Sequence, residues 1–257
     1  MVNIDLRNKI FPRSPLRYPG GKSRAVKLIL ELFPKRMDVL VSPFIGGGSV
    51  EIAASSLGIK VIGYDIFNPL VNFYHELLNN PLKLADEVRK YFPLSKAAFY
   101  YLQKYIPNST LESAAIFYVL NRCSFSGSTY SGGMSPGHPR FTESSIEYLM
   151  QFKAPTMTVL FGDFHDTLLQ HKNEFLYLDP PYLIQNNLYG KKGDAHKNFD
   201  HFGLKELLSK RNNWVLSYND CKEIREMYKD YKIISAQWKY GMSNNKFSAE
   251  VLIINNI

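Results

Sequence analysis

Two patterns of hydrophobic and polar positions alternate along the chain: short continuous apolar runs, and longer runs with apolar residues at helical spacing. Apolar residues recur every three to four positions over "GKSRAVKLILELF" (21–33), which predicts a helix. The apolar run "DVLVS" (38–42) predicts a short buried strand, and a helix over 50–58 and a strand over "KVIGYD" (60–65) follow it. A strand, a Gly-rich turn, a helix and a second strand within about thirty residues are typical of one half of a nucleotide-binding fold.

The pattern changes between Pro69 and about Phe152, where several helical stretches occur without a convincing strand. Ser109 and Glu112 form a capping-box pattern, which predicts the start of a helix before "AAIFYVL". That helix is expected to end in a loop rich in Gly, Ser and Pro, "RCSFSGSTYSGGMSPGHPRF". We therefore predict that residues 69–153 form an inserted, mostly helical domain.

Strand-like runs return after this insertion, with helical patterns between most of them. They are "TMTVLF", "EFLYLD", "NWVLSY", "YKIISA" and "AEVLIIN". With the first two strands they make seven. Alternation of this kind predicts an α/β fold, a Rossmann-like, mostly parallel seven-stranded sheet with helices on both faces, formed by residues 1–68 and 154–257.

Composition adds a bias towards anionic partners. The 257 residues carry a formal net charge of +8 with a pI near 9.2, which favours a polyanion or an anionic ligand. The excess is concentrated in residues 1–36, where Asp5 and Glu31 are the only acids. The basic residues there are Arg7, Lys9, Arg13, Arg17, Lys22, Arg24, Lys27, Lys35 and Arg36.

Cysteine usage and the apolar runs point to a reducing compartment. Cys123 and Cys221 are far apart, which argues against a disulfide framework and against a cysteine zinc site, and we expect no metal. The start "MVNIDLRNKIFPRS" has charges where a secretion signal needs an apolar core, and no run reaches the length of a membrane span. We expect a cytoplasmic protein that does not contact a membrane.

Candidate chemistry gathers at the predicted carboxyl ends of the strands. The turn "PFIGGG" follows the first strand, and Asp65, Asp163 and Asp179 follow the next three. In a parallel sheet these ends share one crevice. Glycines 46–48 leave the backbone open to a ligand at a helix N-terminus, and Asp65 is placed to accept hydrogen bonds from ribose hydroxyls. The alternative for Asp65 is a cap on the helix that begins near Pro69.

Two familiar phosphate-binding motifs do not fit. "PGGKS" would need a glycine at Leu16 to form a P-loop, and a dinucleotide fingerprint would need a glycine at Glu51. "RYPGGKS" can still form a tight turn that bears the cation Lys22 and the flat ring of Tyr18. The alternative is a surface helix start with a solvated lysine.

The tetrapeptide "DPPY" (179–182) is the most specific signal. Two prolines fix two φ angles and remove two donors, so the corner is rigid. Asp179 and the Pro180 carbonyl are then acceptors without donors, and Tyr182 adds a stacking face. This combination suits a planar base with an exocyclic amine, whereas the alternative is a structural corner with Tyr182 packed on the core.

In the order of its motifs the chain resembles the Dam-type (D12 class, alpha group) DNA adenine-N6 methyltransferases. "LRYPGGKS", "VSPFIGGGSVEI", "GYDIFNPLVNFY" and "LYLDPPY" look like the N-terminal cofactor, Gly-rich, ribose-binding and catalytic motifs of that family. "LNRCSFSGSTY" looks like its DNA-recognition loop, with Ser126 where relatives usually carry asparagine, while "SYND" and "QWKYGMSNN" occupy the places of its late motifs.

The resemblance implies transfer of a methyl group from S-adenosyl-L-methionine to the N6 amine of a flipped adenine in double-stranded DNA. It implies catalytic roles for Asp179, Pro180 and Tyr182. It implies cofactor contacts at Tyr18, Lys22, Phe44, Gly46, Gly48, Asp65, Asp163 and Asp179. It also makes 69–153 the target-recognition domain, with DNA contacts at Arg122, Phe125, Ser128, Tyr130 and Arg140.

Two alternatives to adenine methylation stay open. Cytosine-N4 methylation presents the same kind of amine, and a nucleic-acid-binding module without turnover would retain the same fold. We expect a monomer, and the sequence leaves open whether a cognate restriction endonuclease acts separately on the same site.

Overall fold

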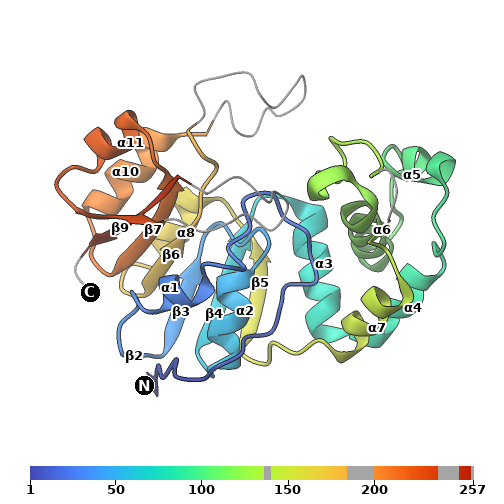
Figure 1. Ribbon diagram of the computed structural model, residues 1–257, viewed down its shortest axis with the longest axis horizontal. Helices are drawn as coiled ribbons and strands as arrows, with labels where there is room; N and C mark the ends of the chain where they lie inside the picture. The colour runs from blue at the N-terminus through green and yellow to red at the C-terminus, as the bar shows by residue number, and fades with distance from the viewer. Residues whose placement is uncertain (136–139, 184–198, 237–248, 256–257) are drawn as a thin grey trace.

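The computed structural model describes residues 1–135, 140–183, 199–236 and 249–255, and its centre is a seven-stranded sheet (Figure 1). The strand order is β5-β4-β3-β6-β7-β9-β8, with all neighbouring pairs parallel except those that β9 makes with β7 and β8. The strands are β3 (Val39–Ser42), β4 (Lys60–Asp65), β5 (Met157–Phe161), β6 (Phe175–Leu178), β7 (Trp214–Asn219), β8 (Lys232–Ala236) and β9 (Glu250–Asn255). The predicted seven-stranded, mostly parallel sheet is confirmed.

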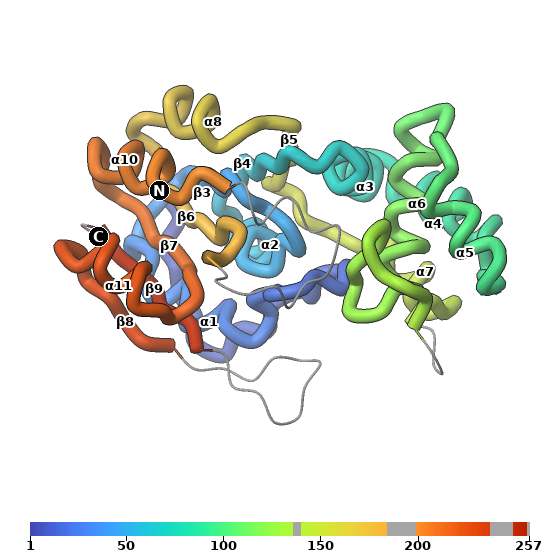
Figure 2. The backbone as a smooth tube through the Cα atoms, turned by 90° about the horizontal axis from the view of Figure 1, so that it is seen from above, coloured from blue at the N-terminus to red at the C-terminus, as the bar shows by residue number. Residues whose placement is uncertain are grey.

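Side chains alternate between two hydrophobic cores, one on each face of the sheet. In β6, Phe175 and Tyr177 belong to one core, and Leu176 and Leu178 to the other. This is the period of two that a strand imposes, and the run is continuously apolar because both faces are covered. Figure 2 shows helices on both sides of the sheet. Those on the first face are α1 (Val26–Leu30) and α2 (Ser49–Ser56), and those on the second are α8 (Phe164–Gln170), α10 (His201–Ser209) and α11 (Lys222–Met227).

The predicted insertion between β4 and β5 is helical and forms the lobe on the right of Figure 1. It contains α3 (Asn68–Asn79), α4 (Pro81–Arg89), α5 (Lys96–Leu102), α6 (Thr110–Cys123), the 3-10 turn η1 (Phe125–Gly127) and α7 (Glu143–Gln151). Helix α3 contacts β4 and β5 on one side and α6 on the other, so the first core continues from the sheet into this lobe. The division into 1–68 with 154–257 and 69–153 stays a prediction.

Local capping agrees with the sequence at Ser109, with one difference. Its hydroxyl accepts from the Glu112 N–H at 3.1 Å, which starts α6 as predicted. The Glu112 carboxylate accepts from the N–H of Asn108, one residue before the cap, at 2.6 Å. The two-residue strands β1 (Val2–Asn3) and β2 (Arg36–Met37) were not predicted, because two residues are too few to show a period.

Candidate active site

Neighbouring strands bring the predicted acids to one edge of the sheet. Asp65 ends β4, Asp163 follows β5, and Asp179 follows β6, while the Gly-rich turn follows β3 between β4 and β6. Because these strands are parallel, their carboxyl ends point the same way and the three carboxylates share one rim.

The Gly-rich turn is shaped around Tyr18. A Cβ at Gly46 would lie 2.9 Å from Tyr18 Cε1, and one at Gly47 would lie 2.7 Å from Tyr18 Cβ. Gly48 has φ +65°, and its hypothetical Cβ would meet the Tyr74 hydroxyl. The glycines therefore admit a ring of this chain to the backbone, whereas the sequence suggested only room for a ligand. Phe44, on the same turn, packs against Phe164 with ring centroids 5.6 Å apart.

Asp65 bonds to two backbone N–H groups but does not cap α3, whose N-cap residue is Phe67 and has no side-chain capping bond; its contact with a ribose stays a prediction. One oxygen accepts from the Gly46 N–H at 3.2 Å, and the other from the Phe67 N–H at 3.0 Å, next to the start of α3. Burial raises the pKa of this carboxyl, and the backbone donors oppose that shift. A carboxylate offers about four lone pairs, so Asp65 can hold the turn and still accept from a ligand hydroxyl.

Asp163 caps a helix at the same rim. It is the N-cap of α8 and accepts from the His165 N–H at 2.8 Å. The same oxygen lies 2.6 Å from His165 Nδ1, whose ring also approaches Asp200. The half-exposed carboxylate thus has a local structural role beside its predicted contact with the cofactor.

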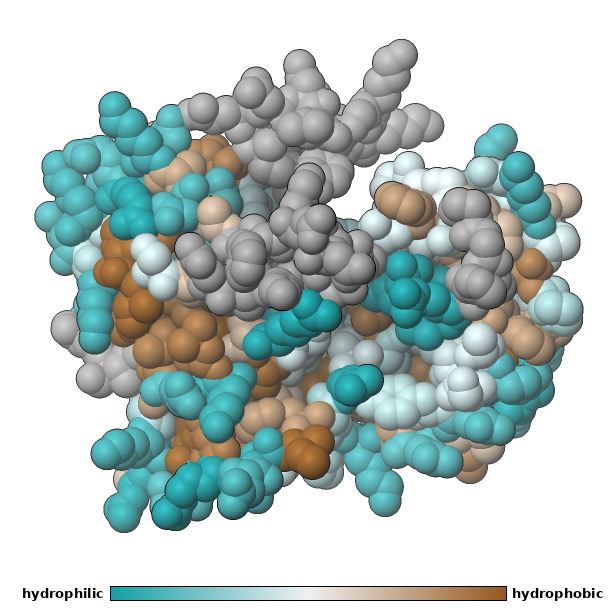
Figure 3. Space-filling model, viewed as in Figure 1, coloured by the Kyte–Doolittle hydropathy of each residue, from teal (hydrophilic) through white to brown (hydrophobic). Residues whose placement is uncertain are grey.

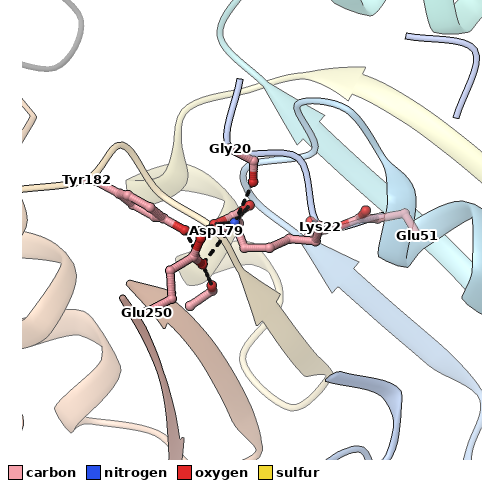
Figure 4. Close-up of polar contacts among 8 residues, drawn as sticks. Gly20, Lys22, Glu51, Asp179, Tyr182 and Glu250 are labelled. Carbon is pink, nitrogen blue, oxygen red and sulfur yellow. Dashed lines mark hydrogen bonds and ion pairs between the residues drawn. The ribbon is translucent and has the colours of Figure 1, made fainter. Parts of the chain in front are cut away.

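Lys22 joins the "PGGKS" turn to the "DPPY" corner (Figure 4). Its Nζ donates to both oxygens of Asp179 at 2.7 Å, to the Gly20 carbonyl at 2.9 Å and to the Tyr182 hydroxyl at 2.8 Å. The lysine side chain is 3% exposed. A solvated surface lysine, the alternative raised from the sequence, is therefore wrong.

The Asp179 carboxyl is strongly perturbed. Burial raises its pKa to about 6, Lys22 opposes the shift, and the charge of Glu250 adds to it. Pro180, the next residue, is buried. The corner is held from β7 as well, because the Asn219 side chain accepts from the Leu183 N–H at 3.1 Å and donates to the Leu183 carbonyl at 2.9 Å.

Tyr182 is tied by its hydroxyl, which the sequence did not suggest. The hydroxyl accepts from Lys22 and donates to Glu250 Oε2 at 2.5 Å (Figure 4). Its ring lies 6.2 Å from that of Tyr218, so Tyr182 does pack partly on the second core. The packing fits the structural corner raised as an alternative, while the stacking role of Tyr182 stays a prediction.

A further buried acid lies behind the site. Glu51 is 2% exposed and accepts from the Ser42 hydroxyl at 2.7 Å. Burial raises its pKa to about 7, and the Ser42 bond opposes that shift. The sequence drew attention to Glu51 only as a missing glycine.

The predicted DNA contacts divide into tied and exposed side chains. The Arg122 guanidinium donates to the Arg140 carbonyl at 2.8 and 2.6 Å and to the Pro15 carbonyl at 3.4 Å, which fixes the loop. Phe125 is 63% exposed, and the Arg140 side chain is exposed. Ser128 bonds within the loop to the Phe125 carbonyl at 2.7 Å.

Tyr130 is the predicted DNA contact that also packs next to the turn held by Asp65. It is partly buried and packs edge-on against Phe67, with ring centroids 6.0 Å apart. Phe67 is the residue whose N–H bonds to Asp65. Replacement of Tyr130 would therefore remove packing from Phe67, which in turn bonds to Asp65.

Asn121 joins the recognition loop to the N-terminal motif. Its fully buried side chain accepts from the Arg17 N–H at 2.8 Å and donates to the carbonyls of Arg17 at 2.8 Å and Gly127 at 3.3 Å. A Cβ at Gly127 would collide with the Arg17 carbonyl. Because Tyr18 follows Arg17, the loop and the Gly-rich turn share one joint.

Sequence reasoning missed three polar residues of this region: Asn121, Asn219 and Glu250. Each is a polar residue inside or at the end of an apolar run, "AAIFYVLN", "WVLSYN" and "AEVLII", and that interruption was the available signal. The late motif "QWKYGMSNN" lies outside the described residues.

Within residues 1–135, 140–183, 199–236 and 249–255, no group of three or more His, Cys, Asp or Glu side chains is arranged to hold a metal ion. In the same ranges, none of the helices combines the length and apolar character needed to span a bilayer.

Comparison with known proteins agrees with this geometry. A family model described as D12 class N6 adenine-specific DNA methyltransferase matches residues 18–242. The modification methylase StsI of Streptococcus sanguinis is 28% identical over an alignment of 293 positions, which spans 96% of this chain and 43% of that protein. The DNA adenine methylase of Haemophilus influenzae is 26% identical over 93% of this chain and 91% of its own length, and that of Vibrio cholerae is 28% identical over 91% of each.

Proposed function

Because this chain belongs to the D12 class N6 adenine-specific DNA methyltransferase family, we propose that it transfers a methyl group from S-adenosyl-L-methionine to adenine N6 in double-stranded DNA at the Asp179 corner. The observation that carries the assignment of residues is the rigid "DPPY" corner at the carboxyl edge of the sheet, with a partly buried carboxylate and a tyrosine on it.

The charges around the corner suit a cationic ligand. Two carboxylates, Asp179 and Glu250, surround one ammonium, that of Lys22, which leaves a negative surplus when both are ionised. S-adenosyl-L-methionine supplies the methyl group as a positively charged sulfonium. A surplus of opposite charge in a buried site favours such a ligand.

The other predicted cofactor residues offer complementary groups. Asp65 has lone pairs left for ribose hydroxyls, and Tyr18 lies between Asp65 and Asp179, whose charges add to the burial that raises the pKa of its phenol. Phe44 and Asp163 line the same rim and are proposed to contact the adenine of the cofactor. Gly46 and Gly48 give the turn the conformation that this arrangement requires.

The chemistry assigned to the corner is acceptance of hydrogen bonds from the target amine. The N6 lone pair is delocalised into the ring, so an acceptor for each N6 hydrogen, Asp179 and the Pro180 carbonyl, localises electron density on nitrogen. Each Asp179 oxygen already accepts from Lys22 and has a second lone pair for the amine. The adenine must leave the duplex at a cost of a few kcal/mol, and stacking on Tyr182 returns roughly 1–3 kcal/mol.

We assign DNA recognition to the inserted lobe. Arg140 and Phe125 are exposed there and are proposed to contact DNA directly, with Ser128 and Tyr130 beside them, while Arg122 holds the loop in place. The protein is proposed to act as a monomer.

The test is a methylation assay in which the DNA is digested to nucleosides and analysed by mass spectrometry. Wild type should produce N6-methyladenine, and Asp179→Asn should lower turnover by about 10²–10³ with little change in DNA affinity, because the amide turns one acceptor oxygen into a donor. N4-methylcytosine in the digest would support the cytosine alternative. DNA binding without any methylated base would support a binding module, and turnover by Asp179→Asn within a fewfold of wild type would remove the proposed role of this corner.

A further inference from the structure

Glu250 is buried at the active-site edge although it lies far from the other site residues in sequence. It begins β9, which runs antiparallel to β7, and its register partner is Asn219 at the end of β7. The first residue of β9 therefore lies at the carboxyl edge of the parallel strands. The Glu250 side chain is 1% exposed.

Within the part of the chain that the structure describes, three polar groups face the Glu250 carboxylate. The Tyr182 hydroxyl donates to it at 2.5 Å, the Ser217 hydroxyl donates at 3.3 Å, and Lys22 Nζ lies 3.5 Å away (Figure 4). Burial of a carboxylate is costly unless it is paired and hydrogen-bonded. A buried acid whose contacts include two side chains of the proposed active site therefore calls for a role there.

We propose that Glu250 is a positioning residue for methyl transfer: it anchors the Tyr182 ring through the phenol hydroxyl and shares Lys22 with Asp179. The proposal rests on the function assigned above. The anchor fixes the plane on which the target base is to stack. The shared lysine leaves Asp179 a stronger acceptor than it would be as the sole counter-ion of Lys22.

The geometry explains why the anchor needs a carboxylate. The hydroxyl of Tyr182 accepts from Lys22 and donates to Glu250, so it lies in a chain that runs from cation to anion. Such charge-assisted bonds are shorter and stronger than neutral ones. A glutamine can accept from the tyrosine, but its amide group would also bring donors towards the lysine.

The first test compares Glu250→Gln, Tyr182→Phe and the double variant. Glu250→Gln should lower kcat by about 10²-fold, with KM for S-adenosyl-L-methionine changed less than threefold, because a misplaced reacting geometry costs about that much. Tyr182→Phe should lower kcat about tenfold, and less than Tyr182→Ala does, because it keeps the ring. The double variant should be no slower than Glu250→Gln, since both changes break one linkage. If the kcat loss of the double variant equalled the product of the two single losses, the proposal would be overturned.

The second test is the pH profile, which a merely structural role would not move. The ionisable groups that face Asp179 are Lys22, Glu250, Tyr182, Tyr18, Tyr177 and Glu51. Glu250 raises the pKa of Asp179, so Glu250→Gln should move the acid limb of kcat/KM, expected near pH 6 in wild type, to lower pH. The matched control is Glu76→Gln, a buried glutamate of α3, which should leave the limb in place. If the acid limb of kcat/KM stayed at the same pH in Glu250→Gln, the proposal that Glu250 shares Lys22 with Asp179 would be contradicted.

A third measurement does not need turnover. With 2-aminopurine at the target position, wild type should give the fluorescence increase of an unstacked base, and Glu250→Gln and Tyr182→Phe should both change that signal in the protein–DNA complex, while Glu76→Gln should not. If wild type flips the base but produces no N6-methyladenine, the proposed function fails while the anchor stands. If methylation proceeds and neither variant alters the signal, the anchor fails alone.

Discussion

Individual acids in this site have different protonation behaviour because burial and neighbours differ. Asp179 has a pKa of about 6 despite Lys22, and Glu51, whose carboxyl accepts from the Ser42 hydroxyl, has a pKa of about 7. Both are raised above the ordinary carboxyl range because their charged forms lose water. The proposed acceptor is thus ionised at neutral pH, while Glu51 is near its midpoint.

Glu51 should make the free energy of unfolding depend on pH. In the unfolded chain its pKa returns to about 4.5, so between pH 4.5 and 7 the folded state holds a proton that the unfolded state has released. Stability from this group is therefore present below pH 4.5 and is lost as pH rises through 7. Glu51→Gln should gain stability relative to wild type as pH rises through this window, measured by urea unfolding.

Ser42→Ala is the informative counterpart. Loss of the Ser42 hydroxyl removes a bond that lowers the pKa of Glu51, so the decline with pH should become larger and extend above pH 7. Parallel pH dependence of wild type and Glu51→Gln would show that Glu51 does not titrate in the folded protein.

At the residue scale the sequence was informative where a motif is compact. "DPPY" and Lys22 were identified, because rigid or unusual residue combinations carry their signal locally. Glu250 and Asn121 were not, since their partners lie in other segments. The hydroxyl of Tyr182 was missed for the same reason: its acceptor is 68 residues away.

Among the elements, the joint at Asn121 couples two segments that the sequence presented separately. Loss of the side chain would leave the carbonyls of Arg17 and Gly127 without this donor. Asn121→Ala should cost roughly 1–3 kcal/mol in the free energy of unfolding, as buried unsatisfied groups do. We also expect the joint to couple the two ligands, so that DNA raises the affinity for S-adenosyl-L-methionine in wild type and raises it less in Asn121→Ala, measured by titration calorimetry with and without DNA.

A matched control for this joint lies between α3 and α6. Asn72 donates to the Ser113 hydroxyl at 3.1 Å, away from the loop. Asn72→Ala should leave the effect of DNA on cofactor affinity unchanged. If DNA changed the cofactor affinity of Asn121→Ala and of wild type by the same factor, the contacts of Asn121 would serve only the stability of the fold.

The recognition loop gives a second prediction at this scale. Arg140 is exposed, so Arg140→Ala should weaken DNA binding or alter sequence preference while cofactor affinity stays within about twofold of wild type. Fluorescence anisotropy with labelled duplexes measures DNA affinity and sequence preference, and calorimetry measures cofactor affinity. Tyr130→Ala should weaken cofactor binding as well as DNA binding, because Tyr130 packs against Phe67, whose N–H bonds to Asp65. If Arg140→Ala instead lost cofactor binding, the loop would contribute to the cofactor site and not to DNA recognition.

Elements were predictable where periodicity was long enough to show. The strands of the sheet follow from apolar runs, and α6 from its cap, but η1 does not. Ser126 there adopts φ +54° and Ser126–Gly127 turn the chain against Arg17. Asparagine tolerates this left-handed region better than serine, so Ser126→Asn should be accommodated here without added backbone strain.

For the whole molecule, the uneven positive charge predicts salt-dependent DNA binding. Hydrophilic side chains cover the outer margins of both lobes in Figure 3. Of the nine basic residues in 1–36, Lys22 is paired with Asp179 and Arg7 with Asp5. The remaining positions include exposed Arg13, and several should displace counter-ions from phosphates.

DNA affinity should therefore fall steeply between low and physiological salt. Arg13→Ala should reduce the slope of log affinity against log salt by about one. The control is Lys229→Ala, since Lys229 is already paired with Glu226 at 2.7 Å. A flat response in wild type would exclude a substantial phosphate contribution.

The position of β9 also bears on how the protein is synthesised. β9 follows both β7 and β8 in the chain, yet it pairs with both, and among the described strands β8 pairs with β9 alone. On the ribosome, β8 therefore emerges before its partner and exposes an open strand edge of the kind that aggregates or recruits chaperones. A nascent chain that stalls before residue 250 also lacks the acid that faces Lys22 and Tyr182. Truncated products that lack β9 should consequently be degradation-prone and should methylate DNA far more slowly than the full chain.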